Sequence, residues 1–319
     1  MPLESDYYLY SRILLTIVFW YGISFALFAQ ELEPRGYANL PKGMNALAVV
    51  AGLSSGNVAV DPSLPIADLK ITGHSAGIGY MRTFGLAGKL ARVLVNVPYM
   101  SLTGNLKLNG QDTSISRNGF GDLRMLFGIN LIGSPAVGSS EFRQYQQKTI
   151  VGLSLLVVAP TGLYLEDKLV NLGSNRWAFK PELGVSKRFK NIYAEAYSGF
   201  WFYTKNNEFL VTKTKKVEPV FSIQGHANYY FRNHIWVGIN GNWFTGGQTF
   251  VNDVPAGNLK DNWRIGATVS SPLFSPKHFI KLQFHVGAFT NSGYKYSVLT
   301  LGYQYVFFGR KDVKKVDIK

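Results

Sequence analysis

The chain has 319 residues, of which 46% are hydrophobic and 16% charged, a low charged fraction for a water-soluble protein. It contains no cysteine, which excludes disulfide bonds, thiolate metal sites and a cysteine nucleophile. The formal net charge is +14, but the basic residues are scattered, with one dense run at Lys213–Lys216. We therefore expect anionic lipids or solutes as partners and no nucleic acid; a solvated basic surface is the alternative.

Residues 1–30 have the pattern of a secretory signal peptide. An apolar run covers residues 13–29, follows Arg12 and ends at the small residue Ala29, before the polar sequence QELEP. Such a run followed by a small residue is typical of a cleaved signal peptide. An uncleaved anchor helix is the alternative, because about 17 apolar residues is the lower limit for a membrane span. In both cases the rest of the chain leaves the cytoplasm.

Residues 31–42 form a short segment before the first predicted strand. The sequence ELEPRGYANLP is too polar for lipid and too rich in proline for a transmembrane strand. If the strands that follow close into a barrel, we expect this segment to fold into the lumen as a plug or gate. Glu33, Arg35 and Tyr37 would then bond luminal charges. A disordered periplasmic leader is the alternative.

Residues 43–308 contain about twelve segments in which apolar and polar residues alternate. In one of them Trp177, Phe179 and Leu183 occupy one face, and Lys180 and Glu182 the other. A period of two is typical of a strand whose faces meet different environments, and most segments are long enough for a tilted membrane strand. The segments span 43–60, 69–84, 88–107, 119–133, 146–160, 176–189, 191–204, 216–232, 234–246, 262–274, 277–290 and 295–308.

The connections between these segments alternate in length. Short turns are expected at 84–88, 189–191, 232–234 and 274–277, and long polar loops at 61–68, 108–118, 161–175, 205–215 and 247–261. Two connections break this rule: 133–145 is long and 290–295 is short. Short turns alternating with long loops are typical of outer-membrane barrels. The sequence predicts an all-β fold, a transmembrane antiparallel β-barrel of about 12 strands, with ten or fourteen as alternatives.

The polar faces of the predicted strands carry the candidate luminal residues. These are Asp122, Arg124, Lys180, Glu182, Glu195, His226, Arg232, Arg264 and Lys281. They would pair with one another across the lumen, or line a solute path and bias it electrostatically. Five aromatic residues face the same side and would contact an aromatic solute or fill the barrel. These are Tyr193, Tyr197, Trp201, Tyr230 and Trp236.

No catalytic constellation is evident in the sequence. The five histidines show no HExxH spacing. Ser222 and His226 share a face but would lie roughly 13 Å apart along a strand, too far for a nucleophile and its base. We therefore expect no enzyme activity, no metal and no cofactor. A hydrolase assembled from neighbouring strands is the alternative.

The last predicted strand ends in the sequence TLGYQYVF, residues 300–307. Gly302, Tyr305 and Phe307 resemble the terminal signal that the barrel-assembly machinery reads, so this machinery is an expected partner. That signal usually ends a chain, whereas here a basic tail follows at 309–319.

Five runs together resemble one outer-membrane transporter family, labelled "MetA-pathway of phenol degradation". They lie at 31–45, 121–136, 157–164, 171–186 and 244–249, and the sequence NLGSNRW at 171–177 is the most specific. The resemblance covers nearly the whole chain after the signal peptide. It implies a barrel in a Gram-negative outer membrane that takes up small hydrophobic or aromatic solutes passively. The alternative function is a structural or lipopolysaccharide-binding barrel without transport.

Overall fold

The computed structural model describes residues 32–59, 66–108 and 111–309. The predicted signal peptide lies outside the described residues, as does the basic tail from residue 310. Within the described part, no helix is long and apolar enough to cross a membrane.

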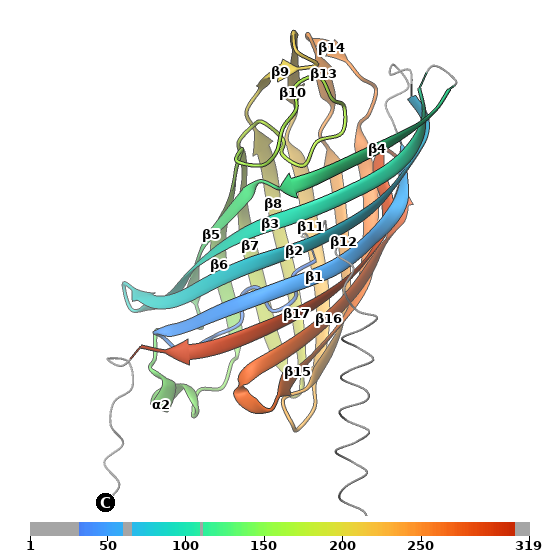
Figure 1. Ribbon diagram of the computed structural model, residues 1–319. Coiled ribbons are helices and arrows are strands. Elements are labelled where there is room, and N and C mark those ends of the chain that lie inside the picture. Colours follow the sequence, from blue (N-terminus) through green and yellow to red (C-terminus); the bar gives the residue numbers. More distant parts are fainter. Residues whose placement is uncertain (1–31, 60–65, 109–110, 310–319) are drawn as a thin grey trace, which may run out of the picture.

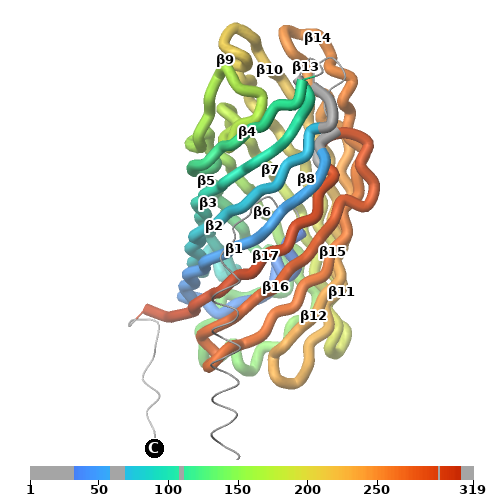
Figure 2. Tube along the Cα trace, turned by 45° about the vertical axis from the view of Figure 1, so that its right-hand side comes forward, coloured from blue at the N-terminus to red at the C-terminus, as the bar shows by residue number. Residues whose placement is uncertain are grey.

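Twelve antiparallel strand positions close into a barrel (Figure 1). The strands are β1 (Met44–Ala59), β2 (Ile66–Leu86), β3 (Lys89–Leu108), β4 (Gln111–Phe120), β5 (Leu123–Ile132), β6 (Thr149–Ala159), β7 (Ala178–Phe189), β8 (Ile192–Tyr203), β11 (Val220–Tyr230), β12 (Trp236–Gly246), β15 (Lys260–Leu273), β16 (Ser275–Thr290) and β17 (Gly293–Phe308). Strands β4 and β5 follow one another along β3 and share one position. The barrel closes because β1 pairs with both β2 and β17 (Figure 2). The predicted fold and strand number are confirmed.

The alternation of the strands turns polar side chains inward and apolar ones outward. On β11, Ser222 and Gln224 are 1% and 5% exposed, whereas Ile223 and Tyr229 are 41% and 42% exposed. A water-soluble sandwich would bury the apolar face and expose the charged one. The inverted arrangement fits a closed barrel in lipid, where every backbone group of the wall is paired and the outer face is apolar.

The two ends of the barrel differ. Tight turns at Ala87–Gly88, at Lys190–Asn191 and at Phe274 join strands at one end, and the helix α2 (Ser139–Phe142) lies at this end too (Figure 1). The long connections 160–177, 204–219 and 247–259 lie at the opposite end. Short turns mark the periplasmic end of such barrels, so we call the opposite end the outer end.

Three predicted loops contain strands, and the prediction there is wrong. Residues 111–120 form β4 along β3. Most of their side chains are polar on both faces of the strand, so the sequence shows little alternation of apolar and polar residues there. The loops predicted at 205–215 and 247–261 carry a small sheet at the outer end (Figure 1). Its strands are β9 (Asn206–Phe209), β10 (Lys213–Val217), β13 (Thr249–Val251) and β14 (Val254–Pro255).

Candidate functional site

Residues 32–43, the N-terminal segment, run inside the barrel. Leu32, Tyr37 and Asn39 are 1%, 4% and 6% exposed. The segment is too polar to be held by apolar packing alone, so its contacts are hydrogen bonds and ion pairs to side chains of the wall. These partners come from strands on several sides of the lumen, which fixes the segment across it.

Arg35 makes the central ion pair of the segment. Its Nη1 lies 3.0 Å from Glu195 Oε1, and its backbone N donates to Glu195 Oε2 at 2.7 Å. Nε donates to the Tyr230 hydroxyl at 3.1 Å and Nη2 to Gln147 Oε1 at 3.2 Å. The guanidinium also stacks 3.9 Å above the ring of Tyr193. A buried ion pair holds only when further hydrogen bonds satisfy both ions, and here they do.

Tyr37 rests on two glycines of the wall. Gly152 of β6 and Gly184 of β7 pair directly across the sheet. A Cβ atom added at Gly184 would lie 2.0 Å from Tyr37 Cε2, and one at Gly152 2.6 Å from Cδ1. The Tyr37 hydroxyl lies 2.9 Å from Ser154 Oγ and donates to the carbonyl of Glu182 at 3.2 Å. Burial and the neighbouring carboxylate raise the pKa of Tyr37, so the hydroxyl stays protonated.

Other residues of the segment are also bonded to the wall. Lys281 pairs with Glu33 at 2.5 Å, and Arg92 donates to the carbonyl of Gly36. Arg92 Nη2 donates to Asn130 Oδ1 at 2.9 Å. All three residues that the sequence suggested for a plug therefore contact the wall. Arg92 was missed, although a charged residue within the apolar alternation of LARVLVNV is the signal that marks it.

Polar side chains continue across the lumen away from the segment. Lys180 and Glu182, two residues apart on β7, pair at 2.8 Å. On the next strands, His226 Nδ1 lies 2.8 Å from Asn240 Oδ1, and Asn240 donates to Thr268 Oγ1 at 2.9 Å. The interior is therefore filled by a bonded polar network around the segment.

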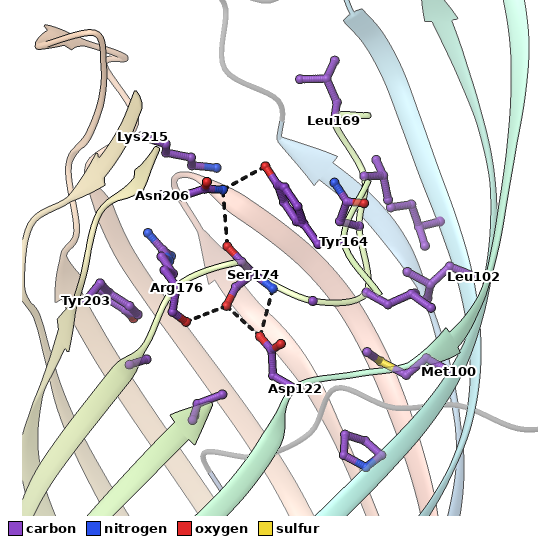
Figure 3. Close-up of a pocket in the computed structure, with 18 of the residues that line it drawn as sticks. Met100, Leu102, Asp122, Tyr164, Leu169, Ser174, Arg176, Tyr203, Asn206 and Lys215 are labelled. Atoms are coloured by element: carbon purple, nitrogen blue, oxygen red, sulfur yellow. Dashed lines mark hydrogen bonds between the residues drawn. The ribbon is translucent and has the colours of Figure 1, made fainter. Parts of the chain in front are cut away.

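A second feature, the outer pocket, lies at the outer end of the barrel. It is a cavity of about 480 Å³ between the barrel strands and the connection 160–177 (Figure 3). Asp122 fixes this connection: its Oδ1 accepts from the backbone N of Gly162 at 3.0 Å. Its Oδ2 accepts from the backbone N and the hydroxyl of Ser174 at 2.9 and 2.6 Å. The sequence NLGSNRW at 171–177 thus forms part of the pocket, with Gly173 packed against Gly162.

The sides of the outer pocket differ in character. One side is apolar and includes Met100, Leu102 and Leu172, which belong to one buried cluster. The facing side carries Arg176 and Lys215 (Figure 3). A concave, largely apolar site with a few polar groups is the usual form of a small-molecule site.

Comparison with known proteins identifies the family. The sequence model described as "MetA-pathway of phenol degradation" matches residues 51–305. The chain belongs to this family. No curated protein matches the chain.

A solved structure shows the same fold. The COG4313 outer membrane channel from Pseudomonas putida F1 is similar with a TM-score of 0.73 and 19% identity, over 87% of this chain and 100% of that chain. Two structures are more distant. The CymD monoaromatic hydrocarbon channel has a TM-score of 0.43 at 9% identity, over 90% and 95% of the two chains. A Pseudomonas aeruginosa FadL homologue has 0.43 at 8%, over 88% and 99%. The protein is an outer-membrane β-barrel.

Seven of the nine predicted luminal residues fall into two groups within this barrel. Lys180, Glu182, Glu195, His226 and Lys281 lie in or beside the network around the N-terminal segment. Asp122 and Arg124 line the outer pocket instead. Arg264 stacks over the rings of Phe244 and Tyr296, at 5.1 and 4.8 Å.

One predicted luminal residue is misplaced. Arg232 is exposed in the turn between β11 and β12, because β11 ends at Tyr230 and the alternation no longer holds beyond it. The five predicted inward aromatics, by contrast, all contact residues of the lumen or the outer pocket. Within the described residues, no group of three or more histidine or acidic side chains could hold a metal ion.

The suggested assembly signal lies on the last strand. Gly302, Tyr305 and Phe307 belong to β17, which pairs with β1 and β16 where the barrel closes. Tyr305 and Phe307 are half-buried, and their rings stack with centroids 5.7 Å apart. Recognition by the assembly machinery stays a prediction.

Proposed function

We propose that the protein is an outer-membrane channel for the passive uptake of small hydrophobic or aromatic compounds. The observation that carries this proposal is the combination of an apolar-sided pocket at the outer end with a lumen occupied by the N-terminal segment. A general porin for hydrophilic solutes needs a continuous aqueous lumen. The family label supports aromatic solutes, and the name of the Pseudomonas putida F1 protein supports a channel.

The proposed mechanism has two steps. A solute first binds in the outer pocket, where the apolar side removes its surface from water. It then passes along the lumen when the N-terminal segment moves. Before it continues into β1, the segment is held by hydrogen bonds and ion pairs, so thermal motion can release it. The luminal charges would bias which solutes pass.

Solute uptake into vesicles tests the proposal. The vesicles should carry lipopolysaccharide in the outer leaflet, since apolar solutes cross a plain phospholipid bilayer unaided. We expect the protein to accelerate the uptake of a neutral aromatic solute more than that of a sugar of similar size. Equal acceleration of both, or none of either, would contradict the proposal. Vesicles with Lys180→Gln would show whether the luminal charge alters this preference.

A barrel that binds lipopolysaccharide without transport is the second candidate. Exposed Lys213 and Lys216 lie on the small sheet at the outer end, where anionic headgroups would be within reach. In the same vesicles such a barrel would leave the uptake of every solute at the level of protein-free vesicles. Loss of lipopolysaccharide binding in the double variant Lys213→Gln/Lys216→Gln would support this second function.

A further inference from the structure

Arg176 is a half-buried cation, and one of its donor atoms has no hydrogen-bond partner among the described residues. It precedes β7 in the sequence NLGSNRW, and its guanidinium lies 4.4 Å above the ring of Tyr203. Within the described residues, its Nη1 is buried and has no hydrogen-bond partner. Burial lowers the pKa of Arg176, but a guanidinium still keeps its charge at neutral pH. Buried polar groups of this kind are rare in folded proteins and call for an explanation.

The acidic residue nearest to this cation is already engaged. Asp122 attracts Arg176 through space, yet both carboxylate oxygens accept hydrogen bonds from Gly162 and Ser174. In the part of the chain that the structure describes, Asp122 and Arg176 form no ion pair. Arg124 and Lys215 also line the outer pocket. Both of these side chains have partners of their own, and among the described residues that line the pocket Asp122 is the acidic one.

The opposite side of the pocket suits an apolar group. Met100, Leu102 and Leu172 form part of a buried cluster there. Trp201 also lines the pocket, on the side of Arg176, where it stacks on Tyr203. The cavity of about 480 Å³ is within the range of about 300–1,000 Å³ that small ligands occupy. A ligand that matches both sides has an apolar body and an anionic head.

We infer that the outer pocket binds amphiphilic carboxylates, such as aromatic acids, with the carboxylate at Arg176 and the apolar body against Met100 and Leu102. A carboxylate beside the guanidinium satisfies Nη1 once the side chain turns this buried atom toward the cavity, in the charge-assisted pairing that guanidinium groups favour. The inference rests on the proposed channel function and narrows its solute class. Neutral aromatics would still enter the pocket, but with lower affinity.

A matched pair of ligands tests this inference. 3-Phenylpropanoate and 3-phenylpropanol share a ring and a chain length and differ only in the head group. Their dissociation constants would be measured by titration calorimetry on the full chain in lipid nanodiscs. We expect the acid to bind about tenfold more tightly than the alcohol, as a charge-assisted hydrogen bond implies. Arg176→Gln should remove this preference and leave the affinity for the alcohol unchanged.

Two further variants make the result interpretable. Arg176→Lys keeps a charge without the fork of donors and should retain part of the preference. Arg143→Gln, an exposed site beside α2 at the opposite end, should bind both ligands as the unaltered protein does. Heat-modifiable migration in detergent gels would show that each variant is folded.

The outcomes separate this inference from the proposed function. If the acid binds no better than the alcohol, or if Arg176→Gln keeps the preference, the inference is wrong. Uptake of the neutral alcohol into vesicles reports on the channel function by itself. If the alcohol is taken up normally in these cases, the channel function stands. If neither compound binds or enters, both proposals fail.

Discussion

Among the luminal residues, Arg35 is the one whose substitution we expect to lower the free energy of unfolding most. Arg35→Ala leaves Glu195 without its cation, although Ser186 and Asn228 still donate to it at 2.8 and 3.2 Å. We expect a loss of about 3 kcal/mol in the free energy of unfolding, the lower end for breaking a buried ion pair, because water can enter the vacated lumen. Denaturant unfolding in detergent micelles would measure it.

Two further variants serve as controls for this prediction: a double variant of the buried ion pair, and a variant of an exposed ion pair. Arg35→Ala combined with Glu195→Gln should recover part of the loss, because no buried charge is then left alone. Lys168→Ala removes an exposed pair with Asp167 and should leave the unfolding midpoint unchanged. Equal losses in Arg35→Ala and the double variant would show that the pairing does not stabilise the protein.

A substitution at Gly184 tests whether the ring of Tyr37 packs against this position of the wall. Gly184→Ala would place a methyl group 2.0 Å from the Tyr37 ring and should displace the N-terminal segment. The chain has no cysteine, so Ala38→Cys can be labelled alone with a maleimide. We expect faster labelling of this thiol in the Gly184→Ala background.

The matched control for this labelling is Gly225→Ala. A Cβ at Gly225 meets nothing within 4 Å, and this residue faces outward on β11. Labelling should therefore match that of the parent protein with Ala38→Cys. Equal labelling rates in the Gly184→Ala and Gly225→Ala variants would contradict the packing of Tyr37 against Gly184.

Among the elements, the connection 160–177 depends on one side chain of the barrel. Asp122→Asn removes the charge that holds Gly162 and Ser174, and hydrogen bonds to a charged group contribute about 1.5–3 kcal/mol each. We expect the connection to loosen, so that trypsin cleaves after Lys168 faster in intact membranes. Asp112→Asn, exposed on β4, should not change the cleavage rate. Unchanged cleavage in Asp122→Asn would contradict the anchoring role.

The same element shows where sequence reasoning reaches its limit. Alternation identified the strand containing Lys180 and Glu182, and the polarity of the N-terminal segment suggested a place in the lumen. Alternation could not show that Gly152 and Gly184 face one another, because this needs the register between β6 and β7. Nor could it show that Asp122 serves the connection 160–177, since the partner lies 40 residues away or more.

The whole molecule was more predictable than its parts. Twelve strands, a polar interior and an apolar exterior follow from the period of two, and lipid outside the barrel imposes that period along the strands. The outer end lies beyond this constraint. The strands β4, β9, β10, β13 and β14 were therefore missed, because residues that do not face lipid need not alternate apolar with polar side chains. The apolar side of the outer pocket was missed because Met100 and Leu102 are apolar residues on the inner face of β3, where the pattern predicts polar ones.

The N-terminal segment occupies the lumen, and we propose that it controls passage through the barrel. Single-channel conductance of the full-length protein and of a variant lacking residues 32–41 tests this most directly. We predict a small conductance for the full-length protein and a larger, steadier one for the deletion variant, because the bonds of Arg35 and Tyr37 to the wall are lost. The same conductance in both proteins would contradict the claim.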